Sequence, residues 1–311
     1  MKERTHQISL IFGIAALFFV ATAGREALAQ GAQNPKGKTL SLGIVFKGPR
    51  EPIEAHFQDF VDYVARKLYS MPEIKGRVVV APTALQLVKP ILEKQVDFYL
   101  ESPYPTYLIN TQGVATLLVR RWKGGMADYR SLLFTGKESG ATRVEDLRGK
   151  IIAFEDPGST SGYFLPKLLL LKKGLTVTEK PGLEAKVSPN EIGYIFTYSD
   201  SKIVELVLAK KVAAGAFSND DYSTLDENRR TAIVILTQSE PIPRHLVSVR
   251  KDLPPETTKR LKEILLAMHL DEEGQKILRQ TDNTAKFDLL PGGEEMFRQN
   301  LVELFRGREK K

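Results

Sequence analysis

The chain has 311 residues, 42% of them hydrophobic, which is enough for one large or two medium domains with apolar cores. Its 45 basic and 38 acidic side chains give a formal charge of +7 without a long basic tract, so no nucleic-acid partner is expected. The sequence contains no cysteine, which excludes disulfides, thiolate metal sites and a lipid-modified N-terminal cysteine.

The N-terminal segment has the pattern of an export signal. Basic residues in 1–7 precede an almost wholly apolar run at 8–23, and Ala27-Leu28-Ala29 has the small-x-small pattern of a signal-peptidase site. We expect a signal peptide at 1–29, a flexible leader at 30–38 and a mature protein in the periplasm. The alternative is an uncleaved membrane anchor, because the apolar run approaches the length of a short membrane span.

Strands and helices alternate through the first hundred residues after the leader. Short apolar runs predict strands at 40–46, 77–80 and 96–100, and apolar side chains at helical spacing predict amphipathic helices at 56–68 and 83–95. This alternation is typical of an α/β domain with a largely parallel sheet. Ligands of such domains lie beyond the carboxyl ends of the strands.

Three loops follow strand ends and are therefore candidate ligand loops: 47–50, 101–104 and 155–162. In the third, an Asp-Pro-Gly turn precedes three hydroxyl residues and a glycine, namely Ser159, Thr160, Ser161 and Gly162. Because a helix follows, its free N–H groups and these hydroxyls predict an anion site. The alternative is that the hydroxyl residues only cap the helix, although three in succession exceed what one cap needs.

The rest of the chain repeats the alternation. Apolar runs predict strands at 131–135, 151–154, 192–198 and 213–217, and helices are expected at 141–149, from Ser161, and at 201–209. Strands at 233–236 and 245–249 are expected to return to the first unit. Amphipathic spacing predicts the last helices at 255–270, 272–280 and 294–305.

Several motifs carry a family resemblance. The run Asp156-Pro157-Gly158-Ser159-Thr160-Ser161-Gly162-Tyr163, closed by Pro166, is similar to the anion loop of the phosphonate and phosphate-type periplasmic solute-binding proteins of ABC importers. Further matches are the run 144–150, Val96-Asp97-Phe98 and the segment 239–253. Together they cover most of residues 39–255 in the family's order.

The resemblance implies a bilobed α/β fold of the type II kind, with two mixed or parallel sheets flanked by helices. One lobe would be discontinuous, at 39–134 and 236–311, and would enclose a second lobe at 135–235. Two crossing segments, about 122–135 and about 233–249, would form the hinge.

The resemblance also implies two more anion contacts, commonly a tyrosine after the third strand and a histidine in a turn of the second lobe. The aligned residues here are Glu101 and Ser199. A carboxylate facing a phosphonate is repulsive unless it is protonated or serves a cationic part of the ligand. The alternative for Glu101 is an ordinary exposed loop acid. Candidates to replace the missing contacts, together with Ser102 of the same loop, are Tyr104, Tyr107 and Arg50.

Asn219 and Asp220 align with the loop that meets the opposite end of the ligand in the family. The alternative is an ordinary turn, for which the run Ser218-Asn219-Asp220-Asp221 is well suited. If Glu101 and Asp220 both face the cleft, the ligand should carry an amine or bring a cation.

No enzyme, metal site or cofactor is expected. The 4 histidines lack metal-ligand spacing, and nucleotide-binding and serine-elbow motifs are missing from the sequence. We predict reversible capture of a phosphonate or phosphate-like oxyanion by a monomer that delivers it to an ABC permease. Alternatives are a ligand sensor that docks on a membrane kinase, and a secreted hydrolase using Ser159 or Ser161, for which no base is recognisable. The sequence leaves open phosphate, phosphite, phosphonate, sulfonate and amine-bearing ligands.

Overall fold

The computed structural model describes residues 39–306, which belong to one compact unit. The predicted signal peptide at 1–29 and leader at 30–38 lie outside the described residues. Among the helices of the described part, none is both long and apolar enough to cross a bilayer.

The first sheet has six strands in the order β14-β4-β13-β3-β1-β2. Strands β1, β2 and β3 are parallel, whereas β13 runs antiparallel to β3 and β4, and β14 antiparallel to β4. The strand bounds are β1 (Ser41–Val45), β2 (Arg77–Ala81), β3 (Phe98–Glu101), β4 (Ala115–Arg121), β13 (His245–Arg250) and β14 (Phe287–Asp288).

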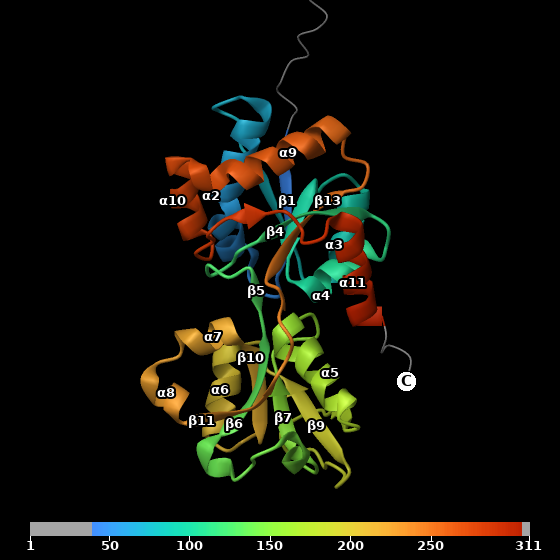
Figure 1. The fold of residues 1–311 in the computed structure, drawn as a ribbon, viewed down its shortest axis with the longest axis vertical. Helices are drawn as coiled ribbons and strands as arrows, with labels where there is room; N and C mark the ends of the chain where they lie inside the picture. Colours follow the sequence, from blue (N-terminus) through green and yellow to red (C-terminus); the bar gives the residue numbers. More distant parts are fainter. Residues whose placement is uncertain (1–38, 307–311) are drawn as a thin grey trace, which may run out of the picture. The chain divides into compact units, whose positions relative to one another are not determined.

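Helices cover both faces of this sheet. Figure 1 shows α2, α9 and α10 on one face and α3, α4 and α11 on the other, which agrees with the separate apolar clusters on the two faces. The helix bounds are α2 (Arg50–Tyr69), α3 (Ala84–Leu92), α4 (Pro103–Asn110), α9 (Pro255–Ala267), α10 (Glu272–Gln280) and α11 (Glu294–Arg306). The sheet is therefore the middle layer of three.

The second sheet also has six strands, in the order β11-β6-β10-β7-β9-β8. Strands β7, β8, β9 and β10 are parallel, and β6 runs antiparallel to both β10 and β11. The strand bounds are β6 (Ser131–Gly136), β7 (Ile151–Phe154), β8 (Thr176–Glu179), β9 (Glu191–Phe196), β10 (Ala214–Ser218) and β11 (Ile233–Gln238).

Helices also cover this second sheet. Figure 1 shows α5 on one side of it and α6 and α7 on the other. Close packing explains Gly215 of β10, where a Cβ atom would lie 2.1 Å from Cγ2 of Ile203 in α6. The helix bounds are α5 (Leu165–Lys172), α6 (Asp200–Leu208), α7 (Asn219–Thr224) and α8 (Glu227–Thr231). In place of the predicted helix at 141–149 the chain forms a short 3-10 turn, Val144–Leu147.

The chain crosses twice between the sheets. It passes from β4 to β6 through β5 (Asp128–Tyr129), and it returns from β11 to β13 through β12 (Ile242–Pro243). The two crossings pair as antiparallel strands, with Ile242 opposite Tyr129. The predicted lobe boundaries at 134/135 and 235/236 fall inside β6 and β11.

The strand predicted at Ile233–Leu236 does not join the first sheet. It forms β11, which pairs with β6 at the edge of the second sheet. The reason is proximity, because α8 ends at Thr231 and leaves only a short connection to that edge. The predicted strand at His245–Val249 does join the first sheet, as β13.

The last helix, α11, contacts residues next to both sheets. Phe305 of α11 is fully buried, with its ring centroid 5.4 Å from that of Tyr104 in α4 and 4.8 Å from that of Phe164, which precedes α5. Leu304 packs against the small apolar cluster around Tyr129. Helix α11 therefore packs beside the crossings as well as on the first sheet.

Candidate functional site

A cavity of about 360 Å³ lies where the strand ends of the two sheets meet the crossing segments. Residues 45–47 and Glu101 to Ser102 line it from the first sheet, and residues 155–156 and 158–161 line it from the second. Lys123, Tyr129, Arg244 and His245 line it from the crossings. The cavity thus lies at the carboxyl ends of β1, β3 and β7, as expected for an α/β fold.

The Ser-Thr-Ser loop is built as a turn that opens a helix. Gly158 N donates to Asp156 Oδ1 at 2.7 Å, and Ser159 Oγ accepts a hydrogen bond from Gly162 N at 2.9 Å as the helix cap. The helix begins with a π-helical turn, Thr160–Phe164, before α5. A Cβ atom at Gly162 would lie 2.7 Å from Cβ of Glu155, so only glycine fits there.

Thr160 and Ser161 join this loop to its surroundings. Thr160 Oγ1 accepts a hydrogen bond from Tyr104 N at 2.9 Å and lies 2.9 Å from Ser102 Oγ, so it bridges the second sheet to the start of α4. Ser131 Oγ donates to the Ser161 carbonyl at 2.6 Å. Both side chains are buried and line the cavity.

Glu101 is a buried acid rather than an exposed loop residue. It ends β3, and its carboxylate accepts hydrogen bonds from Val45 N at 2.7 Å and Ser102 N at 3.3 Å. Burial raises its pKa to about 7, while these bonds and the nearby Lys123 limit the rise. Glu101 therefore lines the cavity and carries a partial charge near neutral pH.

Four more carboxyl groups line the second-sheet wall of the cavity, and we call them the acidic wall: Glu155, Asp156, Asp200 and Asp221. Burial, together with the charges of the neighbouring acids, raises the pKa of Glu155 to about 7 and that of Asp200 to about 8. The buried Oδ1 atom of Asp200 has no hydrogen-bond partner among residues 39–306. The acidic wall is thus short of cations.

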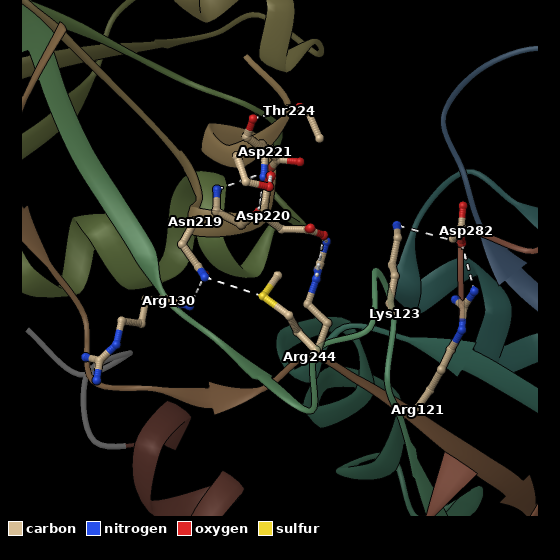
Figure 2. A network of polar contacts seen from close by, with 12 residues as sticks. Arg121, Lys123, Arg130, Asn219, Asp220, Asp221, Thr224, Arg244 and Asp282 are labelled. Atoms are coloured by element: carbon tan, nitrogen blue, oxygen red, sulfur yellow. Dashed lines mark hydrogen bonds and ion pairs between the residues drawn. The ribbon is translucent and has the colours of Figure 1, made fainter. Parts of the chain in front are cut away.

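The crossings supply the cations. Arg244 donates to Asp220 Oδ2 at 3.0 Å, and its guanidinium lies 4.4 Å from the ring centroid of Tyr129. Figure 2 shows Lys123 and Arg121 directed at the same carboxylate, Asp282, with nitrogen to oxygen distances of 3.8 and 3.0 Å. Arg244 and Lys123 both line the cavity and give this side of it positive charge. We call this side the floor: Lys123, Tyr129, Arg244 and His245.

Two more side chains from the crossings, Tyr129 and His245, line the floor. Tyr129 is 1% exposed, and neither its Oη atom nor the buried Nδ1 atom of His245 has a hydrogen-bond partner within the described residues. Sequence reasoning missed both residues, because they lie far apart in the chain and belong to no local motif.

Two further residues of the cavity lining touch each other, with Lys47 Nζ 3.8 Å from the ring centroid of Tyr198. This cation-π contact joins the loop after β1 to the turn before α6. Trp122 begins the first crossing, and Lys286 Nζ lies 4.4 Å from its ring centroid.

Several residues proposed from the sequence do not line the cavity. Arg50 is exposed at the start of α2. Tyr104 stacks on Phe164, and Tyr107 packs against Phe305. Ser199 caps α6 by accepting a hydrogen bond from Lys202 N.

Asn219 and Asp220 hold the crossings to α7. Asn219 Oδ1 accepts a hydrogen bond from Arg130 N at 2.6 Å, and Asp220 pairs with Arg244. Figure 2 shows both at the start of α7, beside Asp221. Asp221, the next residue, is the one that lines the cavity.

Among residues 39–306 there is no group of three or more histidine, cysteine, aspartate or glutamate side chains placed to hold a metal ion.

Comparison with known proteins places the chain in a family. Residues 42–290 match the family model described as ABC transporter, phosphonate, periplasmic substrate-binding protein. The chain belongs to this family. Because its members are substrate-binding proteins, membership does not favour the secreted hydrolase considered from the sequence.

Relatives of the family share the fold. Over 193 residues the chain is 24% identical to the phosphate-import protein PhnD of Mycolicibacterium smegmatis, a match that spans 60% of this chain and 58% of the relative. It is 26% identical to XAC2383 from Xanthomonas citri, solved bound to ATP, with a TM-score of 0.75 over 86% of this chain and 95% of that one.

A further solved relative is PhnD1 from Prochlorococcus marinus in complex with methylphosphonate. It is 16% identical, with a TM-score of 0.65 over 88% of this chain and 98% of that one. The family is one of periplasmic substrate-binding proteins and the chain shares the fold of these solved structures, so the predicted bilobed α/β fold is confirmed. In that fold, each sheet with its helices is one lobe.

Proposed function

We propose that the protein is the solute-binding component of an ABC importer and captures a phosphonate or phosphate-like oxyanion that also carries a cationic group. The observation that carries this proposal is the uneven charge of the cavity. Its floor and the Ser-Thr-Ser loop offer N–H, O–H and cationic groups, whereas its second-sheet wall offers carboxyl groups.

A simple oxyanion leaves the acidic wall without a partner. Five carboxyl groups and three cations line the cavity, so an added anion meets net negative charge when all the acids are ionised. An amine on the ligand would pair with Asp200, Glu155 or Asp221 and lower the pKa values that burial has raised. A ligand with charge at both ends therefore matches the cavity best.

The anionic end is expected at the loop and the floor. Ser161 is buried against the cavity, and Lys123 and Arg244 add positive charge there. XAC2383, which is similar over most of this chain, was solved with ATP and with chloride, and both are anions. These observations support a negatively charged head group.

Capture would proceed by closing the lobes on the ligand. Ser102 and Glu101 come from one lobe, whereas Thr160, Ser161 and the acidic wall come from the other. A ligand that contacts both sides binds the closed arrangement more tightly and shifts the population toward it. An importer permease would then receive the closed form, and we propose that the protein reaches it in the periplasm as a monomer.

The test is isothermal titration of the exported protein with 2-aminoethylphosphonate, methylphosphonate, inorganic phosphate and sulfate at one pH. We expect 2-aminoethylphosphonate to bind most tightly. Asp200→Asn should reduce its advantage over methylphosphonate about tenfold, since a buried charge pair is worth roughly 1.4 kcal/mol or more. Thr160→Ala and Ser161→Ala should weaken binding of every probe.

The control is Glu227→Gln, which changes an exposed acid of α8 and should leave all affinities unchanged. Equal affinity for the aminated and the plain phosphonate would contradict the cationic group. Absence of binding to any of these oxyanions would contradict the oxyanion itself.

A further inference from the structure

The cavity floor contains two polar atoms that the fold leaves unused. Tyr129 Oη and His245 Nδ1 are buried, and neither has a hydrogen-bond partner among residues 39–306. Buried polar groups in native proteins are nearly always paired, so each exception calls for an explanation. With Asp200 Oδ1 on the acidic wall, three such exceptions belong to residues that line one cavity, which points to a group that binds there.

Tyr129 lies on the first crossing and His245 begins β13 directly after the second, and the two crossings are held together. Tyr129 belongs to β5 and pairs with Ile242 of β12, and His245 follows only three residues after Ile242. The antiparallel pairing of β5 with β12 therefore brings the phenol and the imidazole to the floor from two segments that are far apart in the sequence. Neither side chain is placed there by a local turn or cap.

The surroundings of the phenol suit an anion. Burial raises the pKa of Tyr129 to about 12, and the Arg244 charge, followed by the nearby hydroxyls of Thr160 and Ser161, offsets part of this rise. Arg244 lies over the Tyr129 ring, with its charge 4.4 Å from the centroid. The phenol therefore keeps its proton near neutral pH and can donate it in a hydrogen bond.

The imidazole is held neutral by the same surroundings. Burial and the charges of Lys123, Arg244 and Arg121 lower the pKa of His245 well below its ordinary value. A neutral imidazole carries one N–H donor, and a bound anion would favour the tautomer that directs this donor toward it.

We infer that Tyr129 and His245 donate hydrogen bonds from the hinge to the oxyanion of the bound solute. This inference rests on the proposed function and adds contacts to it that come from none of the three candidate ligand loops. The hinge strands then contact the ligand themselves, so occupancy of the floor would be coupled to the closing of the two lobes.

The decisive variant is Tyr129→Phe, which removes one oxygen and keeps the ring under Arg244. If the hydroxyl serves the ligand, its removal should weaken binding of 2-aminoethylphosphonate or inorganic phosphate at least about tenfold, because hydrogen bonds to charged groups are the strong ones. The melting temperature of the ligand-free variant should stay the same or rise, since a buried hydroxyl without a partner is lost.

A matched control is Tyr63→Phe in α2. Tyr63 is also buried, but its hydroxyl donates to Asp271 Oδ2 at 2.8 Å, away from the cavity. This variant should show the reverse pattern, a lower melting temperature with unchanged affinity. His245→Gln, which keeps a donor, should bind more tightly than His245→Leu.

The outcomes separate the two proposals. Wild-type binding together with unchanged affinity in Tyr129→Phe and His245→Leu would overturn the hinge contacts and leave the proposed function standing. A lower melting temperature of ligand-free Tyr129→Phe would show a structural hydroxyl and would also overturn them. If the wild type bound none of the oxyanions, the proposed function would fail and the hinge contacts with it.

Discussion

The floor and the acidic wall of the cavity have opposite chemistry and are built differently. On the floor, Arg244 is paired with Asp220, and Lys123 lies beside Asp282, so the cations are fixed by partners outside the cavity. On the wall, Asp200 and Glu155 lie beside other acids, and burial raises the pKa values of both. The cations of the floor thus have partners without ligand, whereas the wall is stabilised when a cation arrives or protons bind.

The largest effect is expected from breaking the floor. Arg244→Met leaves Asp220 in a mostly buried position without its partner, which should cost about 3 kcal/mol or more of unfolding free energy. Urea denaturation measures the loss. The double variant with Asp220→Leu should recover much of it, and a double variant no more stable than Arg244→Met would contradict this account of the pair.

The next largest effect concerns the proton on Glu101. Folding raises the pKa of this acid from its ordinary value to about 7. Between roughly pH 4.5 and 7 its carboxyl group is therefore protonated in the folded state and ionised in the unfolded state. The stabilising effect is full below that window and is lost as the pH rises through it.

The stability of the wild type relative to Glu101→Gln should therefore fall by roughly 2.5 kcal/mol between pH 5 and pH 8. Parallel urea titrations of both proteins at these two pH values measure the change. A constant difference would show that Glu101 is already ionised at pH 5.

A smaller effect is expected from the contact between the wall and the loop. Gly162→Ala places a Cβ atom against Glu155 and Ser159, and such overpacking costs about 2 kcal/mol. Because the start of the helix must move to make room, the affinity for oxyanions should also fall. Gly182→Ala, where nothing lies within 4 Å of the added Cβ atom, is the control and should change neither quantity.

The smallest effect is expected outside the cavity. Ser199→Ala removes the cap of α6 and should cost about 1 kcal/mol of stability without changing affinity. Calorimetric melting and ligand titration of the same variant separate the two quantities. A large loss of affinity would show that Ser199 reaches the ligand in the closed state.

The fold followed from local patterns in the sequence. Alternating apolar runs and amphipathic spacing predicted β1, β2, α2 and α9, and most of their ends agree with the structure to within a few residues. The patterns are readable because each of these elements buries an apolar face against the neighbouring layer. The strand at 233–236 was assigned to the wrong sheet, since its apolar side chains suit either one and the choice depends on where α8 ends.

The candidate site was only partly predictable. The loop at 159–162 was recognisable because capping, turn and glycine signals are local. The acidic wall was not, since Glu155, Asp200 and Asp221 come from different strand ends and meet only after folding. Tyr129 and His245 depend on the pairing of β5 with β12, which no spacing in the sequence reveals.

The position of Trp122 gives the protein an optical reporter of its own. It is the one tryptophan of the sequence, and it begins a crossing with the Lys286 ammonium 4.4 Å from its ring centroid. Indole emission depends on nearby charge, so a movement of the first crossing against β14 would change its colour or intensity. Solute capture can then be followed by fluorescence in the unlabelled molecule.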